Sequence, residues 1–169
     1  LTVVVDPVRP SDCWFAASTK GVWKSTDYGL TWKKVNTGTN GEWIDGGRPH
    51  YFSIDLNPNR DPATAPTLYV QLLYGLGGLW KSTDGGVNWI DTWKNVYAPD
   101  GFTNILNDVG TDISGAIMAG TSGPEHVLAY LHGYHGTGDN NGIFETTDGG
   151  QCCSHIFGTA HGFGYYCSP

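Results

Sequence analysis

Charged residues are scarce in this chain. Only 15% of its 169 residues are Asp, Glu, Lys or Arg, and 9 basic residues stand against 16 acidic ones. A nucleic-acid partner requires clustered Lys and Arg, whereas the basic residues here are few and scattered. The chain also lacks an apolar run of the roughly 18 to 20 residues that a membrane span needs. We therefore expect no nucleic-acid partner and no membrane span.

Helical periodicity is missing as well, since no segment has the convincing pattern of an amphipathic helix. The chain contains instead 25 Gly, 7 Trp, 9 Tyr and 6 Phe. Aromatic and β-branched runs between turn residues are typical of short strands, and a disordered chain has the opposite composition. The sequence predicts a folded all-β protein.

The cysteines permit disulfides. There are four, and in an oxidising compartment they could form two bridges in any of three pairings; they are Cys13, Cys152, Cys153 and Cys167. A zinc site is the rival interpretation, but the C-x₂-C spacing that brings two thiolates to one metal is absent. We expect a secreted protein with disulfides, and neither a metal nor a cofactor.

One segment occurs three times. Residues 21–29 read GVWKSTDYG, residues 78–86 read GLWKSTDGG, and residues 142–150 read GIFETTDGG. The copies are about 60 residues apart, which is long enough for a four-stranded unit with its loops. A hydroxyl, an aspartate and a glycine follow apolar residues at fixed offsets, as a tight turn between two strands requires.

The pattern S-x-D-x-G-x-x-W resembles the Asp-box, or BNR repeat, of sialidases, xyloglucan-active glycosidases, sortilin-type receptors and related β-propeller proteins. This resemblance implies that the box residues are structural rather than catalytic. They are Ser25, Asp27, Gly29 and Trp32, then Ser82, Asp84, Gly86 and Trp89, and finally Thr146, Asp148 and Gly150. The third copy departs from the pattern, with Thr146 in place of Ser and Cys153 in place of Trp.

Each repeat also contains the other strands of a propeller blade. We predict first strands at 1–5, 51–56 and 113–119, second strands at 13–17, 68–73 and 127–132, and fourth strands at 31–35, 88–93 and 151–157. The box supplies the third strand. The result is a single domain, 1–169, with three four-stranded antiparallel blades at about 1–35, 50–93 and 112–157 and a tail at 158–169.

Three blades would not close a ring, because propellers typically have four to eight and three leave two unpaired faces. The chain is then a fragment of a longer propeller, or its copies associate, for example as a homodimer, or its blades pack differently. The sequence leaves these alternatives open.

The box turns lie at one end of the blades, and the long connections between blades lie at the other. Functional residues concentrate on loops that a rigid scaffold carries. Sugar rings stack on Trp and Tyr, and sugar hydroxyls bond to polar side chains. The candidates for carbohydrate binding at this end are Trp43, Arg48, His50, Tyr74, Tyr97, Tyr134 and His135. Packing of Trp43 and Tyr97 between blades is the alternative.

Glycoside hydrolysis needs two carboxylates roughly 5 to 9.5 Å apart. The candidates are Asp45, Asp100, Asp108 and Asp139, and no spacing singles out a pair. Sialidase activity is not expected, because it needs an arginine cluster and the chain has only Arg9, Arg48 and Arg60.

The function predicted is carbohydrate recognition by a secreted propeller protein, as a glycoside hydrolase acting on polysaccharide. A non-enzymatic module that binds glycan or protein is the first alternative. A polysaccharide lyase is the second, in which Arg48 would hold a uronate carboxylate and His50, Tyr134 or His135 would move protons.

Overall fold

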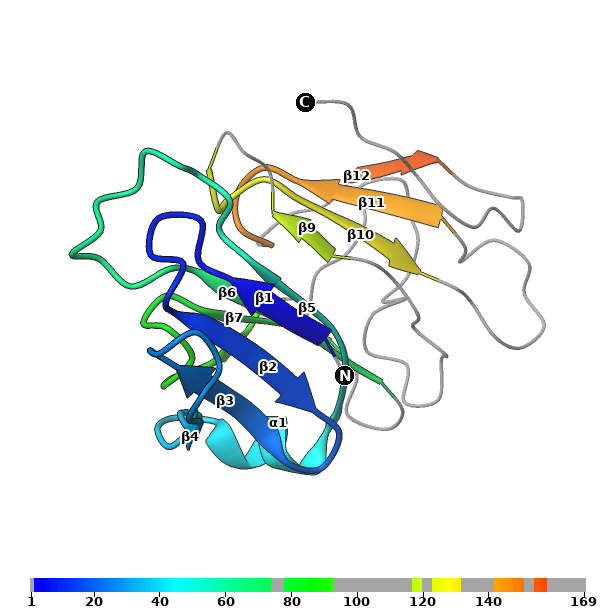
Figure 1. Ribbon diagram of the computed structural model, residues 1–169. Coiled ribbons are helices and arrows are strands. Elements are labelled where there is room, and N and C mark those ends of the chain that lie inside the picture. The colour runs from blue at the N-terminus through cyan, green and yellow to red at the C-terminus, as the bar shows by residue number, and fades with distance from the viewer. Residues whose placement is uncertain are drawn as a thin grey trace.

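The computed structural model describes residues 2–73, 78–92, 117–119, 123–131, 142–150 and 154–157, and these are mostly β-structure (Figure 1). Three four-stranded antiparallel sheets follow one another along the chain. Sheet 1 contains β1 (Thr2–Val5), β2 (Cys13–Ala17), β3 (Gly21–Ser25) and β4 (Lys33–Lys34). Sheet 2 contains β5 (Arg48–Ile54), β6 (Leu68–Leu73), β7 (Leu79–Ser82) and β8 (Ile90–Asp91). Sheet 3 contains β9 (Ile117–Ala119), β10 (Val127–Leu131), β11 (Gly142–Thr146) and β12 (Ser154–Phe157). The predicted all-β antiparallel fold is confirmed.

Strand lengths follow from hydrogen bonding. The second strands β2 and β6 have the predicted bounds, because they pair on both sides. The fourth strands of sheets 1 and 2 are shorter than predicted, since the residues before them belong to the turns: the amide of Thr31 donates to Asp27, and that of Asn88 donates to Asp84. The tail at 158–169 lies outside the described residues, and the domain and blade boundaries stay predictions.

A short helix, α1 (Gly41–Gly46), lies in the connection between sheets 1 and 2. The sequence analysis did not predict it, because six residues are too few to show helical periodicity. Ile44 is fully buried and anchors α1 in the core, while Trp43 on the same helix stays exposed. The short helix α1 is therefore a correction to the prediction that the fold is purely β-structure.

The core lies between sheets 1 and 2. Sheet 1 contributes Trp14, Ala16 and Val22. The residues of sheet 2 in the same cluster are Phe52, Ile54, Leu68, Val70, Leu72 and Trp80. Complete burial of one large apolar side chain contributes about 1.5 to 3 kcal/mol, so this contact is the main source of cohesion between the two sheets.

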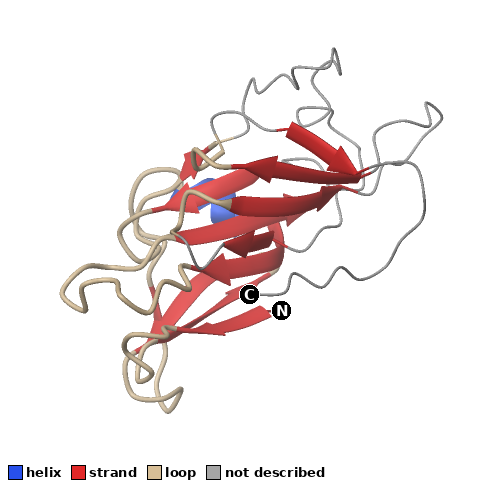
Figure 2. Ribbon diagram, turned by 90° about the horizontal axis from the view of Figure 1, so that it is seen from above, coloured by secondary structure: helices blue, strands red, loops and turns tan. Residues whose placement is uncertain are grey.

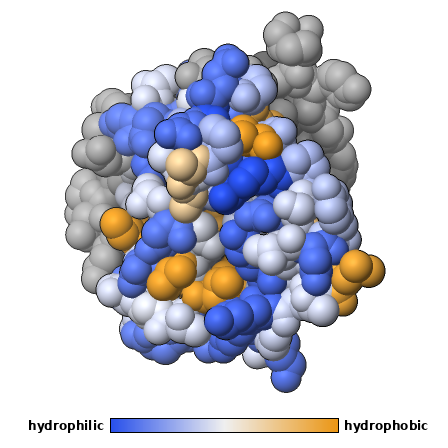
Figure 3. Space-filling view, turned by 60° about the vertical axis from the view of Figure 1, so that its left-hand side comes forward, coloured by the Kyte–Doolittle hydropathy of each residue, from blue (hydrophilic) through white to orange (hydrophobic). Residues whose placement is uncertain are grey.

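The first strands of successive sheets are neighbours: β1 lies beside β5, and β5 beside β9. Turns that join first to second and third to fourth strands share one end of an up-and-down sheet. Figure 2 shows that most described loops gather at one side of the strands. Figure 3 shows hydrophobic surface residues in separate groups among hydrophilic ones.

Cys13 is buried in β2, and it has no disulfide partner among the described residues. The other three cysteines lie outside the described residues, so the disulfides stay a prediction.

Candidate functional site

The three repeated turns share one hydrogen-bond pattern. In each, a Ser or Thr hydroxyl donates to the aspartate at 2.6 to 2.8 Å and accepts a bond from a glycine amide at 2.9 Å. The groups involved are Ser25, Asp27 and Gly29, then Ser82, Asp84 and Gly86, then Thr146, Asp148 and Gly150. The pattern persists in the third turn, because Thr carries the same hydroxyl as Ser.

The turn aspartates bond to the chain itself. Asp27 accepts bonds from the hydroxyls of Ser25 and Thr31 and from the Thr31 amide, and these lower its pKa to about 2. Two tryptophans complete the turns: the indole of Trp32 donates to the Gly29 carbonyl at 3.0 Å, and that of Trp89 donates to the Gly86 carbonyl at 2.9 Å. This geometry suits a turn-stabilising role.

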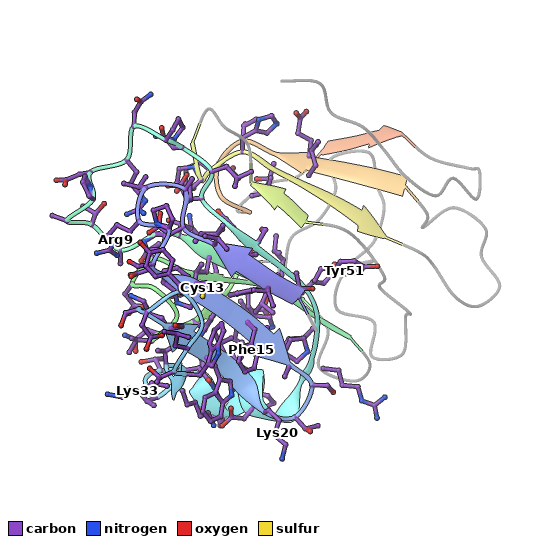
Figure 4. All side chains as sticks on the ribbon, in the orientation of Figure 1. Arg9, Cys13, Phe15, Lys20, Lys33 and Tyr51 are labelled. Atoms are coloured by element: carbon purple, nitrogen blue, oxygen red, sulfur yellow. The ribbon has the colours of Figure 1, made fainter. Side chains whose placement is uncertain are left out.

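The opposite end of sheet 1 carries the described part of the candidate carbohydrate site. It consists of α1, the β2–β3 turn and the start of β5. The amide of Thr19 in that turn donates to the Gly47 carbonyl at 3.3 Å, and Lys20 lies next to α1 (Figure 4). Four exposed side chains of these segments form what we call the α1 face: Lys20, Glu42, Trp43 and Arg48.

Trp43 is the aromatic candidate in this region. Its side chain is 45% exposed, although its neighbour Ile44 is fully buried. The tryptophan is thus carried by a helix fixed to the core, and its indole is partly open to solvent. The alternative, in which Trp43 packs between blades, would bury more of the indole ring than is observed.

Asp45, one of the four catalytic candidates, is held by two neighbours. Its carboxylate accepts bonds from Lys34 Nζ at 2.6 Å and from Asn36 Nδ2 at 2.8 Å. Asn36 also donates to the Gly41 carbonyl at 2.9 Å and accepts from the Val22 amide at 2.8 Å. These bonds connect α1 to β3 and β4, so Asp45 and Asn36 hold the helix in position. A catalytic role for Asp45 stays a prediction.

Gly21, the first residue of the repeated segment, makes this arrangement possible. Its φ is +76°, and a Cβ placed there would overlap the Asp45 carboxylate and the Asn36 amide. The backbone of β3 and the polar pair therefore meet only because residue 21 has no side chain.

Arg48 and His50 were expected in a loop, and this expectation is wrong. Both lie in β5, which begins at Arg48, with an irregularity in pairing between Pro49 and Tyr51. Arg48 is exposed at the start of the strand. The strand extends because Arg48 and Pro49 pair with Leu73 and Leu72 of β6.

The remaining candidates lie outside the described residues. They are Tyr74, Tyr97, Tyr134 and His135 for binding, and Asp100, Asp108 and Asp139 for catalysis. Within the described part of the chain, no three His, Cys, Asp or Glu side chains are grouped as metal ligands. No helix there is long and apolar enough to cross a membrane.

The sequence analysis missed a buried ionic bridge between sheets 1 and 2. Arg60 Nη2 donates to both carboxylate oxygens of Asp6, at 2.7 and 2.6 Å. Burial raises the pKa of Asp6, but the Val8 amide and Arg60 outweigh it, and the pKa lies below its ordinary value. Asp6 and Arg60 are far apart in sequence, so no local pattern could have revealed the pair.

No family model matches the chain. Part of it is similar to curated xyloglucanases. A xyloglucanase of Paenibacillus sp is 32% identical over 98 residues, which are 52% of this chain and 10% of that protein. A xyloglucanase of Acetivibrio thermocellus is 33% identical over 79 residues, 41% of this chain and 9% of that protein. The matched part corresponds to about a tenth of these relatives.

Two solved structures are similar over most of the chain. YCF48 from Cyanidioschyzon merolae gives a TM-score of 0.48 at 16% identity and covers 88% of this chain and 34% of that one. The GH74 xyloglucanase from Xanthomonas campestris gives 0.46 at 15% identity and covers 92% of this chain and 29% of that one.

Proposed function

We propose that this chain recognises polysaccharide through the α1 face, as part of a secreted glycoside hydrolase that acts on a xyloglucan-type β-glucan. The substrate class is supported by the local identity of about a third to two xyloglucanases. The observation that carries the binding proposal is Trp43, partly exposed on a helix fixed to the core.

The chemistry of the α1 face suits a neutral sugar chain. An indole offers an apolar plane for a sugar ring, and an anchored helix loses little freedom on binding. The charged ends of Lys20, Glu42 and Arg48 are exposed in the same region, and they can bond to hydroxyls around the ring. Aromatic stacking would then supply affinity for the sugar chain, and the polar groups would fix its orientation.

Trp43→Ala tests the binding step. We expect affinity for soluble xyloglucan, measured by affinity electrophoresis and calorimetry, to fall about tenfold, which corresponds to about 1.4 kcal/mol. Tyr28→Ala is the matched control, since Tyr28 is also an exposed aromatic residue but belongs to the turn at the other end of sheet 1. Equal losses in both variants, or no loss in Trp43→Ala, would contradict the proposal.

A non-enzymatic glycan-binding module is the second candidate. It is favoured by the bonds of Asp45 to Lys34 and Asn36, which already occupy both its oxygens. Release of reducing sugar from xyloglucan separates the two functions. A hydrolase releases sugar and Trp43→Ala slows it, whereas a binding module retains xyloglucan without cleaving it.

A further inference from the structure

The connection that leads into α1 is hydrogen-bonded to the second repeated turn. Residues 38–40 and 87–89, all of which the structure describes, are joined by four bonds. Two of these are between backbone groups, at 3.0 Å each: the Gly38 amide donates to the Val87 carbonyl, and the Trp89 amide donates to the Thr39 carbonyl. We call these two segments, with the four bonds that join them, the bridge.

The other two bonds of the bridge use asparagine side chains. Asn40 Nδ2 donates to the Trp89 carbonyl at 2.8 Å, and Asn88 Oδ1 accepts from the Thr39 amide at 2.7 Å. Asn40 is the N-cap residue of α1, where an asparagine ordinarily accepts a bond from a helix amide. Its side chain makes no such bond, and its φ is +61°. The residue that begins α1 is therefore bonded to sheet 2 through its side chain.

Asn88 uses both ends of its amide. Its Nδ2 donates to Asp84 Oδ2 at 2.6 Å, as the hydroxyl of Thr31 donates to Asp27 in the first turn. Its Oδ1 accepts from the Thr39 amide. The orientation of the amide is fixed, because a carboxylate only accepts and a backbone amide only donates. A hydroxyl would satisfy the turn, whereas the amide of Asn88 also reaches the segment before α1.

The two segments approach closely because residue 38 is glycine. A Cβ at Gly38 would overlap Asn88 Oδ1 and would lie 3.0 Å from the Val87 carbonyl oxygen. A side chain there would push the segments apart, so the bridge depends on close packing as well as on hydrogen bonds.

The bridge leads directly to Trp43. The amides of Trp43 and Ile44 both donate to the Asn40 carbonyl, at 3.2 and 3.4 Å. Asn40 thus forms the first turn of α1 with its backbone and bonds to sheet 2 with its side chain. A helix of six residues is too short to hold its own position. The direction of α1 therefore depends on the contacts at its two ends.

We propose that Asn88 is a positioning residue for the glycan site. Through the bridge it fixes the point at which α1 begins, and hence the direction in which Trp43 presents its indole. This proposal rests on the proposed function of the α1 face. Asn36 and Asp45 connect α1 to sheet 1, and the bridge supplies the connection to sheet 2. The binding surface of one sheet then depends on a side chain of the next.

Asn88→Thr separates the two tasks of the side chain. Its hydroxyl can donate to Asp84, as Thr31 donates to Asp27, but it is too short to accept from the Thr39 amide as well. Hydrogen exchange followed by mass spectrometry should show about fivefold faster exchange in the peptide that contains α1, with wild-type rates in β2 and β6. Affinity for soluble xyloglucan should fall about three- to fivefold.

Asn40→Gly opens the bridge from the other side. Glycine adopts a positive φ without strain, so this change removes the bond to the Trp89 carbonyl and keeps the backbone conformation. We expect the same two effects. Val87→Ala is the matched control, because its side chain is 37% exposed in the same turn and only its carbonyl belongs to the bridge. Effects of equal size in Val87→Ala would overturn the proposal.

The combination of Asn88→Thr with Asn40→Gly tests whether the bridge acts as one unit. The double variant should lose little more xyloglucan affinity than either single variant, because each change opens the same bridge. Losses that add in full would contradict a common bridge.

The remaining outcomes distinguish this proposal from the proposed function. Unchanged exchange in α1 in both single variants would overturn the bridge, and so would faster exchange throughout β2 and β6, which indicates a general loss of stability. Faster exchange in α1 with wild-type xyloglucan affinity would overturn the positioning role, provided that Trp43→Ala weakens binding. Wild-type affinity in Trp43→Ala contradicts the proposed function instead, and the exchange rates then decide by themselves whether Asn88 positions α1.

Discussion

At the scale of single residues, the glycine that opens the repeated segment is tightly constrained. Gly21 combines a left-handed φ with contact to Asn36 and Asp45. Gly78 opens the second copy with φ of +95° and lies close to Asp91. The sequence shows the glycine, but only the structure shows what fills the space beside it.

Gly21→Ala should therefore destabilise the protein by about 2 to 4 kcal/mol, from backbone strain together with steric overlap. Urea unfolding measures the loss. Gly46→Ala, an exposed position at the end of α1, serves as the control and should change stability by less than about 1 kcal/mol. Similar losses in the two variants would contradict the proposed crowding at Gly21.

Acid should unfold the protein through its bonded aspartates. Asp27 has its pKa lowered to about 2 by bonds from Ser25 and Thr31. For Asp6 and Asp84 burial raises the pKa, but hydrogen bonds outweigh it and the pKa of each lies below 3.8. Folded values below the unfolded value mean that this stability is present above about pH 4 and is lost as pH falls toward 2.

Urea unfolding at pH 5, 4, 3 and 2 should show this decline. Asp27→Asn keeps the size of the side chain but removes its titration, so its stability should depend less steeply on pH over the same interval. A wild-type stability that stays level from pH 5 to pH 2 would show that these bonds do not favour the charged carboxylates.

At the scale of elements, α1 depends on the side chain of Asn36. This buried amide bonds to Val22, Gly41 and Asp45 at once. The helix has no side-chain cap at its N-terminus and is too short to be stable alone. Its position is therefore determined by Asn36, Asp45 and the burial of Ile44.

Asn36→Ala should cost about 2 to 3 kcal/mol, because it leaves buried polar groups without partners. It should also weaken xyloglucan binding, since Trp43 loses its fixed support. Thr37→Ala, at the neighbouring exposed position, is the control for both measurements. Full xyloglucan affinity in a folded Asn36→Ala protein would show that α1 does not need this anchor.

At the scale of the whole molecule, apolar packing and one buried ion pair join sheets 1 and 2. Arg60 and Asp6 are 8% and 0% exposed. Removing one partner leaves the other buried and charged, so Arg60→Met should cost about 3 kcal/mol or more. Arg9→Met should cost less, because Arg9 is more exposed.

A double-mutant cycle of Arg60→Met with Asp6→Asn measures the pair itself. We expect the double variant to be more stable than the sum of the single losses predicts, because it contains no isolated buried charge. Additive losses would mean that the two side chains do not act as a pair across the sheets.

The sequence alone determined the unit of the fold. The repeated segment with its hydroxyl, aspartate and glycine identified all three turns, since these groups bond within a few residues of one another. The bounds of β2 and β6 were predictable because each is a short, mostly apolar run that pairs with a strand on either side. The starts of the fourth strands in sheets 1 and 2 were predicted incorrectly for a local reason as well. The amides of Thr31 and Asn88 bond to the turn aspartates, so these residues belong to the turns and not to the strands.

Tertiary structure alone decided how the units meet. Asp45 bonds to Lys34 and Asn36, and residues 41–46 form a helix that exposes Trp43. Strand β5 includes Arg48 because it pairs with β6 there. Asp6 forms an ion pair with Arg60 of the next sheet. Contacts of this kind depend on the relative placement of whole sheets, which the order of residues within each sheet does not specify. The same placement covers Phe52 and Ile54 and leaves Val3 and Val5 exposed, although the two pairs occupy the same position in the repeat.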